Sequence, residues 1–152
     1  MADNESHSTF CYSSAYTHGV DEKRRVQIPA KWRPQDEITF TLITWKKAQQ
    51  QPCLLVLPPD VMKKLMAKIA EMPFSDPRAE TLRRVLGTKS DQVTCDKAGR
   101  ICIPEAMARE AGIDKQAILV GMWDRFQIWS PDRYAATNEA DDAMTSEAMS
   151  LI

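Results

Sequence analysis

The chain has 152 residues, a formal net charge of −1, and 43% hydrophobic and 27% charged residues. This composition is typical of a soluble globular protein with one domain or two small interlocked ones. No run of 18 apolar residues is present, which argues against a transmembrane helix. Residues 1–20 also lack the basic start and apolar stretch of a signal peptide. We therefore expect a cytoplasmic protein with no membrane partner.

Charge is distributed unevenly along the chain. Residues 1–18 and 134–152 hold six of the 21 acidic residues and none of the 20 Lys and Arg residues, so residues 19–133 carry a net charge of +5. Local charge governs phosphate binding more than the overall sum does. The middle of the chain therefore suits a nucleic-acid partner, although acidic ends that only increase solubility also explain the pattern.

The first third of the chain predicts a disordered segment followed by strands. We assign the polar residues 1–13 to a disordered N-terminal extension. Alternating polarity and β-branched or aromatic residues then indicate strands, with a short helix between them. In order, we expect a strand from Ala15, a turn at 21–24, a strand with Val26 and Ile28 in the core, a helix from Pro29, and strands at 38–45 and 53–57.

A helical connector is expected at residues 63–89. Asp60 is expected to cap the first helix, whose apolar residues recur at helical spacing, and Pro73 ends it. Asp76, followed directly by Pro, is typical of the start of a second helix. Gly87 is expected at the C-terminal cap of that helix.

The remaining third predicts a second set of strands and an acidic end. Ile103, Leu119 and Phe126 are expected in the core. Residues 134–152 are rich in Ala, Met and acidic residues, which predicts a weak helix or an acidic tail. In order, we expect a strand at 92–95, a turn, a helix from Pro104 that ends at Gly112, strands at 117–122 and 125–129 joined by a tight connection, and a last helix from Ser130.

Two stretches of the sequence repeat each other. Residues 21–29 and 96–104 both read Asp, three residues, Arg, an aliphatic residue, any residue, Ile and Pro, at an offset of 75. A later pair of strand-to-helix junctions repeats at an offset of 72. We infer an internal duplication, with repeats at 14–62 and 90–133. Because units so small cannot each bury a core, they should interlock about a pseudo-two-fold axis. We expect an α+β fold with one composite, double-split β-barrel and helices outside.

The repeated turns have two interpretations. In a structural role, the Asp accepts hydrogen bonds from turn N–H groups and pairs with the Arg. In a binding role, the two basic tips act together on DNA, because Arg donates paired bonds to phosphate or guanine and a strand–turn–strand tip fits the major groove. The candidate DNA-binding residues are Lys23, Arg24, Arg25, Lys97 and Arg100, and the candidate turn-orienting residues are Asp21, Asp96 and Gly99.

Together, these motifs resemble the MraZ family. The resemblance covers about residues 14–134 and is carried by both Asp-x-x-x-Arg turns and by the stretches 53–58, 86–87, 109–112 and 119–129. MraZ proteins are bacterial transcriptional regulators built from two swapped-hairpin domains of the SpoVT-AbrB type. The resemblance implies a ring-shaped homo-oligomer, associated with the nucleoid, that binds repeated DNA boxes upstream of the division and cell-wall gene cluster and usually of its own gene. The family's DNA-contacting motif maps onto residues 21–25 and 96–100.

The chain departs from the family pattern at two positions. Gly usually precedes the Arg of both turns, and Gly99 follows this rule, but the first turn has Arg24 instead. If that position needs a positive φ, Arg24 is strained or its turn differs. Ser14 also stands where the family favours Gly.

Other classes of function are supported less well. The sequence has no Gly-rich phosphate loop, His-Glu metal cluster or Ser nucleophile elbow, so we expect no enzyme, no cofactor, no metal and no small-molecule substrate. Its cysteines are expected to be reduced thiols: Cys11, Cys53, Cys95 and Cys102. The alternative to a DNA-binding regulator is a ring-forming protein-interaction scaffold or an antitoxin-like member of the AbrB superfamily.

Overall fold

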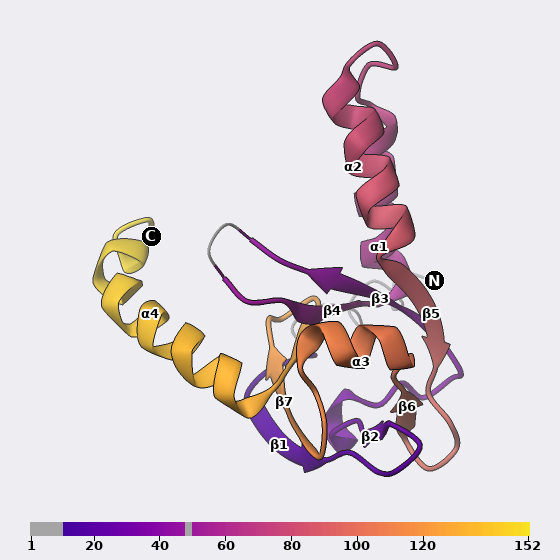
Figure 1. Cartoon of the computed structure of the whole chain (residues 1–152), viewed down its shortest axis with the longest axis vertical. Coiled ribbons are helices and arrows are strands. Elements are labelled where there is room, and N and C mark those ends of the chain that lie inside the picture. The colour runs from indigo at the N-terminus through magenta and orange to yellow at the C-terminus, as the bar shows by residue number, and fades with distance from the viewer. Residues whose placement is uncertain (1–10, 48–49) are drawn as a thin grey trace.

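The computed structural model describes residues 11–47 and 50–152 and confirms the α+β class. Within these residues no helix combines the length and apolar character that a membrane span needs. The elements are β1 (Ala15–Gly19), β2 (Arg25–Gln27), the 3-10 helix η2 (Ala30–Trp32), β3 (Thr39–Trp45), β4 (Cys53–Leu57), α1 (Pro59–Ala70), α2 (Pro77–Thr88), β5 (Ser90–Thr94), β6 (Arg100–Cys102), α3 (Glu105–Ala111), β7 (Gln116–Gly121), β8 (Phe126–Trp129) and α4 (Pro131–Met149) (Figure 1).

The two repeats exchange strands within one antiparallel sheet. Its order is β1-β7-β8-β4-β3-β5, while β2 and β6 pair separately as a two-stranded ribbon. The first strand of each repeat pairs with the third strand of the other, β1 with β7 and β5 with β3. At the centre of the sheet β4 pairs with β8, and Leu55 lies opposite Gln127, 72 positions further on. The strand order is therefore the same from either edge of the sheet once the strands of one repeat are exchanged for those of the other. This symmetry is expected for interlocked repeats.

The closed barrel that we expected is not confirmed. The hydrogen bonds between the described strands define an open six-stranded sheet and a separate ribbon. Each edge strand leads into the ribbon through a tight turn, in which Asp21 N donates to Arg25 O (3.1 Å) and Asp96 N donates to Arg100 O (2.8 Å). Each ribbon strand has only three residues, and an isolated bridge between Val20 and Val26 is the pairing that links the ribbon to the segment after β1.

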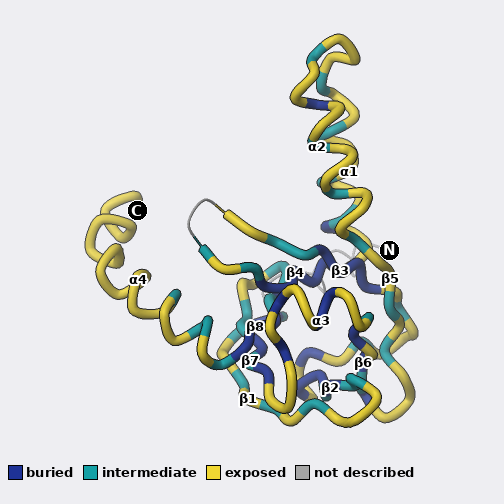
Figure 2. The backbone as a smooth tube through the Cα atoms, viewed as in Figure 1, coloured by how far each residue is buried: buried dark blue, intermediate teal, exposed yellow. Residues whose placement is uncertain are grey.

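One hydrophobic core holds the ribbon against the sheet. The predicted core residues Ile28, Ile103, Leu119 and Phe126 are all fully buried, which confirms them. Figure 2 shows the buried segments gathered in the strands and in the inner side of α3. Burial of a large aliphatic side chain stabilises the fold by roughly 1.5–3 kcal/mol. The core therefore fixes the inner face of the ribbon and leaves the outer face to solvent.

Helices α1 and α2 form a hairpin that projects away from the sheet (Figure 1). Val61 in α1 and Ala79 in α2 are their buried residues. Two predicted helix ends are wrong. Asp60 does not cap α1, because Pro58 occupies the N-cap position and makes no side-chain capping bond, which places Asp60 inside the first turn. Gly87 does not end α2, because the helix continues to Thr88 and Lys89 N still donates to Val85 O.

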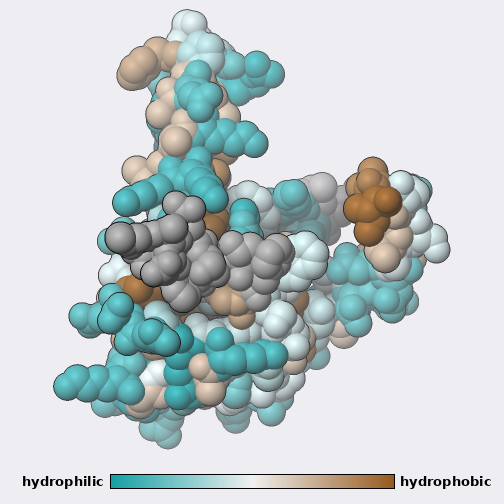
Figure 3. Space-filling model, turned by 180° about the vertical axis from the view of Figure 1, so that it is seen from behind, coloured by the Kyte–Doolittle hydropathy of each residue, from teal (hydrophilic) through white to brown (hydrophobic). Residues whose placement is uncertain are grey.

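The acid-rich end of the chain forms helix α4. Ser130 caps it by accepting a hydrogen bond from Arg133 N at 3.2 Å, as the sequence predicts for a helix start at this residue. None of the residues of α4 is buried, and the chain after it ends in the exposed Leu151 and Ile152. On the face of the molecule that Figure 3 shows, the most hydrophobic patch lies at this C-terminal end.

At the other end of the chain, residues 1–10 of the predicted disordered extension lie outside the described residues. Tyr12, in contrast, belongs to the folded part: it is buried and forms a bridge with Trp123.

Candidate nucleic-acid interface

The two Asp–Arg turns have the same hydrogen-bond pattern. In the first turn, Asp21 Oδ1 accepts from Lys23 N at 2.9 Å and from Arg25 N at 2.8 Å. In the second turn, Asp96 Oδ1 accepts from Ala98 N at 2.9 Å and from Arg100 N at 2.8 Å. Because an Asp side chain satisfies the turn's own N–H groups, the local sequence favours the turn.

Each Asp also holds the arginine of its turn by one nitrogen. Arg25 Nε donates to Asp21 Oδ2 at 2.7 Å, and Arg100 Nε donates to Asp96 Oδ2 at 3.1 Å. Both arginine side chains are 33% exposed. Among the described residues their Nη1 and Nη2 atoms find no protein acceptor. Each guanidinium is thus oriented at Nε and keeps its terminal N–H groups for another partner.

The ion pairs are favoured over a wide pH range. Hydrogen bonds from the backbone N–H of Arg25 lower the pKa of Asp21, and those of Arg100 lower the pKa of Asp96. The nearby guanidinium groups lower both values further. Both carboxylates are therefore ionised at neutral pH, when each one orients its arginine.

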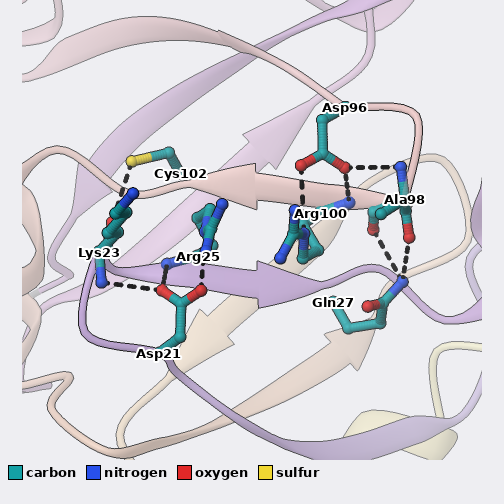
Figure 4. Close-up of polar contacts among 9 residues, drawn as sticks. Asp21, Lys23, Arg25, Gln27, Asp96, Ala98, Arg100 and Cys102 are labelled. Carbon is teal, nitrogen blue, oxygen red and sulfur yellow. Dashed lines mark hydrogen bonds and ion pairs between the residues drawn. The ribbon is translucent and has the colours of Figure 1, made fainter.

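The ribbon places both arginines on one face. Val26 lies opposite Ile101, and both are fully buried. Strand residues alternate between faces, and residues directly opposite in an antiparallel pair share a face. The outer face therefore carries the side chains on either side of this buried pair, with Arg25 opposite Cys102 and Gln27 opposite Arg100 (Figure 4).

The structure places the other predicted site residues in the two turns, at opposite ends of the ribbon. Lys23 and Lys97 are exposed at the tips of the first and second turn. Arg24 has a φ of 62° and Gly99 a φ of 85°, so both occupy the left-handed region that favours glycine. Ser14, the other departure from the family pattern, likewise has a positive φ of 79°. Arg24 is thus tolerated in a strained conformation and does not change the turn.

Arg24 also makes a contact that the sequence did not predict. Its Nε donates to Ile103 O at 2.9 Å, which turns the side chain back toward the other repeat. At the equivalent place beside the second turn, Arg33 Nε donates to Ile28 O at 2.9 Å. A Cβ atom on Gly99 would lie 2.4 Å from Arg33 Nε. A guanidinium therefore occupies the same position beside both turns, but both groups come from the first repeat, one from Arg24 in the turn itself and the other from Arg33 after β2.

Two further residues of the ribbon contact the turns but were not among the site residues predicted from the sequence. Gln27 Nε2 donates to Ala98 O at 2.7 Å, and Cys102 Sγ donates to Lys23 O at 3.2 Å (Figure 4). Both lie at the variable position between the aliphatic residue and Ile of the repeated motif. Their equivalence, 75 positions apart, is the signal that would have pointed to them.

These features define a class of protein: two interlocked repeats that together present one two-stranded ribbon with a basic outer face. A sequence profile of the family described as "MraZ protein, putative antitoxin-like" matches residues 11–85 and 87–150. The chain therefore belongs to the MraZ family, as its motifs predicted.

Similar proteins cover nearly the whole chain. The chain is 33% identical to the transcriptional regulator MraZ of Thermomicrobium roseum, in an alignment that covers 82% of this chain and 84% of that protein. It is 34% identical to that of Desulfitobacterium hafniense over 93% and 96%, and 35% identical to that of Herpetosiphon aurantiacus over 84% and 88%. Each of these relatives is named a transcriptional regulator.

Proposed function

We propose that this protein is a sequence-specific DNA-binding transcriptional regulator that contacts DNA with the ribbon of β2 and β6 and its two turns. One observation carries the proposal. Arg25 and Arg100 lie on one outer face, and each is held at Nε by an aspartate while its terminal nitrogens have no acceptor in the described part of the chain.

The geometry suits the edges of base pairs. A two-stranded β-ribbon is narrow enough for the major groove, and the terminal N–H groups of Arg match guanine O6 and N7. Lys23 and Lys97 at the tips, with the N–H groups of Arg24 not used by Ile103, would contact phosphates. Asp21 and Asp96 would orient the turns without touching DNA, because a carboxylate repels phosphate.

Family membership supplies the expected target. The MraZ resemblance implies repeated boxes upstream of the division and cell-wall gene cluster, often next to the regulator's own gene. The relatives named transcriptional regulators support this role. Such a protein would act in the cytoplasm at the nucleoid.

A titration of labelled DNA tests the proposal. One duplex carries the sequence upstream of the protein's own gene, and a second duplex of equal length carries the same bases scrambled, both at one stated salt concentration. Specific complexes are typically tighter than non-specific ones by about 10³-fold or more. We expect a preference of this kind. Equal affinity for the two duplexes would contradict a sequence-specific regulator.

Self-association through the α1–α2 hairpin is the second part of the proposal. The hairpin exposes Met66 and Val85, and a groove of about 310 Å³ is lined by apolar residues including Met62, Leu65 and Leu86. A ring of such protomers would place several ribbons on repeated boxes and gain avidity. Light scattering coupled to size exclusion should show a mass several times 17.2 kDa, and a monomer would contradict the ring.

The same hairpin supports the alternative of a protein-interaction scaffold. A scaffold predicts assembly without preference for DNA sequence. The titration against scrambled DNA therefore separates the two candidates.

A further inference from the structure

Each turn of the ribbon is supported by a side chain from the other repeat. Gln27, in the first repeat, donates from Nε2 to Ala98 O at 2.7 Å and to Gly99 O at 3.3 Å in the second turn. Cys102, in the second repeat, donates from Sγ to Lys23 O at 3.2 Å in the first turn. Figure 4 shows the two contacts at opposite ends of the ribbon.

The two contacts are equivalent under the internal symmetry. Gln27 and Cys102 stand 75 positions apart, as do their acceptors Lys23 and Ala98. The N–H groups of each turn are bound by the turn's own Asp, whereas these carbonyl oxygens point across the ribbon. Each turn is therefore closed from one side by its own repeat and from the other side by its partner repeat.

We propose that Gln27 and Cys102 are crossed positioning residues for DNA recognition. Gln27 fixes the second turn and thereby Arg100, and Cys102 fixes the first turn and thereby Arg25. The proposal rests on the proposed function, because it assigns these residues a role through the two arginines. The two turns are also held with unequal strength, because the amide N–H of Gln27 is a stronger hydrogen-bond donor than the thiol of Cys102.

Direct base reading by Gln27 is the competing explanation. Gln recognises adenine with its amide nitrogen and oxygen together. In this structure the amide nitrogen already donates to two turn carbonyls, so that pair of bonds is not open to a base. The contacts therefore favour a positioning role.

Double-mutant cycles on the full chain test the crossing. Gln27→Met keeps the length of the side chain and removes its donor, and Cys102→Ala removes the thiol. Loss of one neutral hydrogen bond corresponds to about a two- to tenfold loss of DNA affinity. We expect the loss from Gln27→Met to vanish in an Arg100→Ala background and to persist in an Arg25→Ala background. Cys102→Ala should show the reverse, and Cys102→Ser, which keeps a donor, should bind like the parent.

The opposite pattern would overturn the proposal. If Gln27 reads a base directly, its loss is the same in both arginine backgrounds and depends on which base pair is changed. If the affinity loss from Gln27→Met instead vanishes in the Arg25→Ala background, Gln27 supports the arginine of its own strand. The support would then be local and would not cross between the repeats.

Amide hydrogen exchange separates this proposal from the function on which it rests. If the single arginine variants bind DNA like the parent, the proposed function fails, and exchange in free protein then decides whether crossed support exists. Gln27→Met should speed exchange at the amides of Ala98 and Gly99 and leave those of Lys23 and Arg24 unchanged. Cys102→Ala should again give the reverse. Unchanged exchange in the opposite turn would overturn the crossed support, with or without DNA binding.

Discussion

Val26 lies directly opposite Ile101 in the ribbon, and the two residues are the same position of the two repeats. Both side chains are fully buried, so the pseudo-two-fold axis passes through the core at this pair. A slip of one residue would place Val26 and Ile101 on opposite faces of the ribbon, so that one of them would turn outward and the arginine of its strand would be buried. The register that hides Val26 and Ile101 is therefore what exposes Arg25 and Arg100 together.

Removing one member of this pair should destabilise the whole chain. We predict that Ile101→Ala lowers the free energy of unfolding by about 2–5 kcal/mol, because it leaves a cavity at the interlocked centre. Urea unfolding followed by circular dichroism measures the change. Met144→Ala, on the exposed helix α4, is the control and should stay within about 0.5 kcal/mol of the parent. A small effect at Ile101 would mean that the ribbon is not part of the core.

Two glycines should respond in opposite directions to alanine. Gly99→Ala adds a Cβ at a φ of 85° and against Arg33, so we predict a loss of about 1–3 kcal/mol. Gly87→Ala lies inside α2 with nothing within 4 Å of the new atom, and should gain about 0.5–1 kcal/mol. Thermal unfolding of the two variants measures both. A Gly99→Ala protein as stable as the parent would show that the turn can change its conformation.

The aspartates of the turns predict a dependence of stability on pH. The pKa of Asp96 is lower in the folded protein than in the unfolded chain, chiefly because the Arg100 amide donates to it. Its contribution to stability is therefore complete above the unfolded pKa of about 4 and is lost as the pH falls through the lower folded pKa. The stability difference between the parent and Asp96→Asn should be largest near neutral pH and should shrink below about pH 4. Denaturant titrations from pH 7 to strongly acidic pH measure it, and a constant difference would contradict the assignment.

The cysteines should differ in reactivity. Cys53 is fully buried in β4, and burial raises the pKa of its thiol to about 12. Cys102 is exposed on the outer face of the ribbon, opposite Arg25. We predict that a maleimide labels Cys102 in the folded protein long before Cys53, and that bound DNA slows the labelling of Cys102. Mass spectrometry of timed samples measures both rates, with Cys102→Ser as the control. If DNA leaves the rate at Cys102 unchanged, the outer face does not meet DNA.

The sequence predicts those parts of the fold that depend on local chemistry. The helix starts at Asp76 and Ser130 and the helix end at Gly112 follow from the preferences of single residues for caps, and the structure confirms them. The duplication predicted the exchange of strands, because each repeat alone is too small to bury a core. The helix ends assigned to Asp60 and Gly87 were wrong because α1 already begins at Pro59 and α2 continues to Thr88.

Contacts between the repeats are harder to predict. Gln27 and Cys102 each donate to a backbone carbonyl of the other repeat, and nothing in their own neighbourhood marks them for this role. Arg24 shows the same limit: its charge predicts a phosphate contact, whereas the fold directs its Nε to Ile103 O. Such contacts depend on the register of the ribbon, which only the folded chain defines.

DNA affinity of Arg25→Ala and Arg100→Ala, measured by fluorescence anisotropy over a series of salt concentrations, tests the central claim most directly. We predict that each variant loses about 1–3 kcal/mol of binding free energy if the arginine contacts a base. If it contacts phosphate, the log–log salt slope should become shallower by about 0.9. Thermal stability should change little, because an ion pair that is open to solvent contributes little to folding.

Arg84→Ala, on the projecting hairpin, is the matched control and should bind like the parent at every salt concentration. The result that would contradict the account is a pair of ribbon variants that lose thermal stability but bind DNA with the affinity and salt slope of the parent. The repeated Asp–Arg turns would then only hold the fold together.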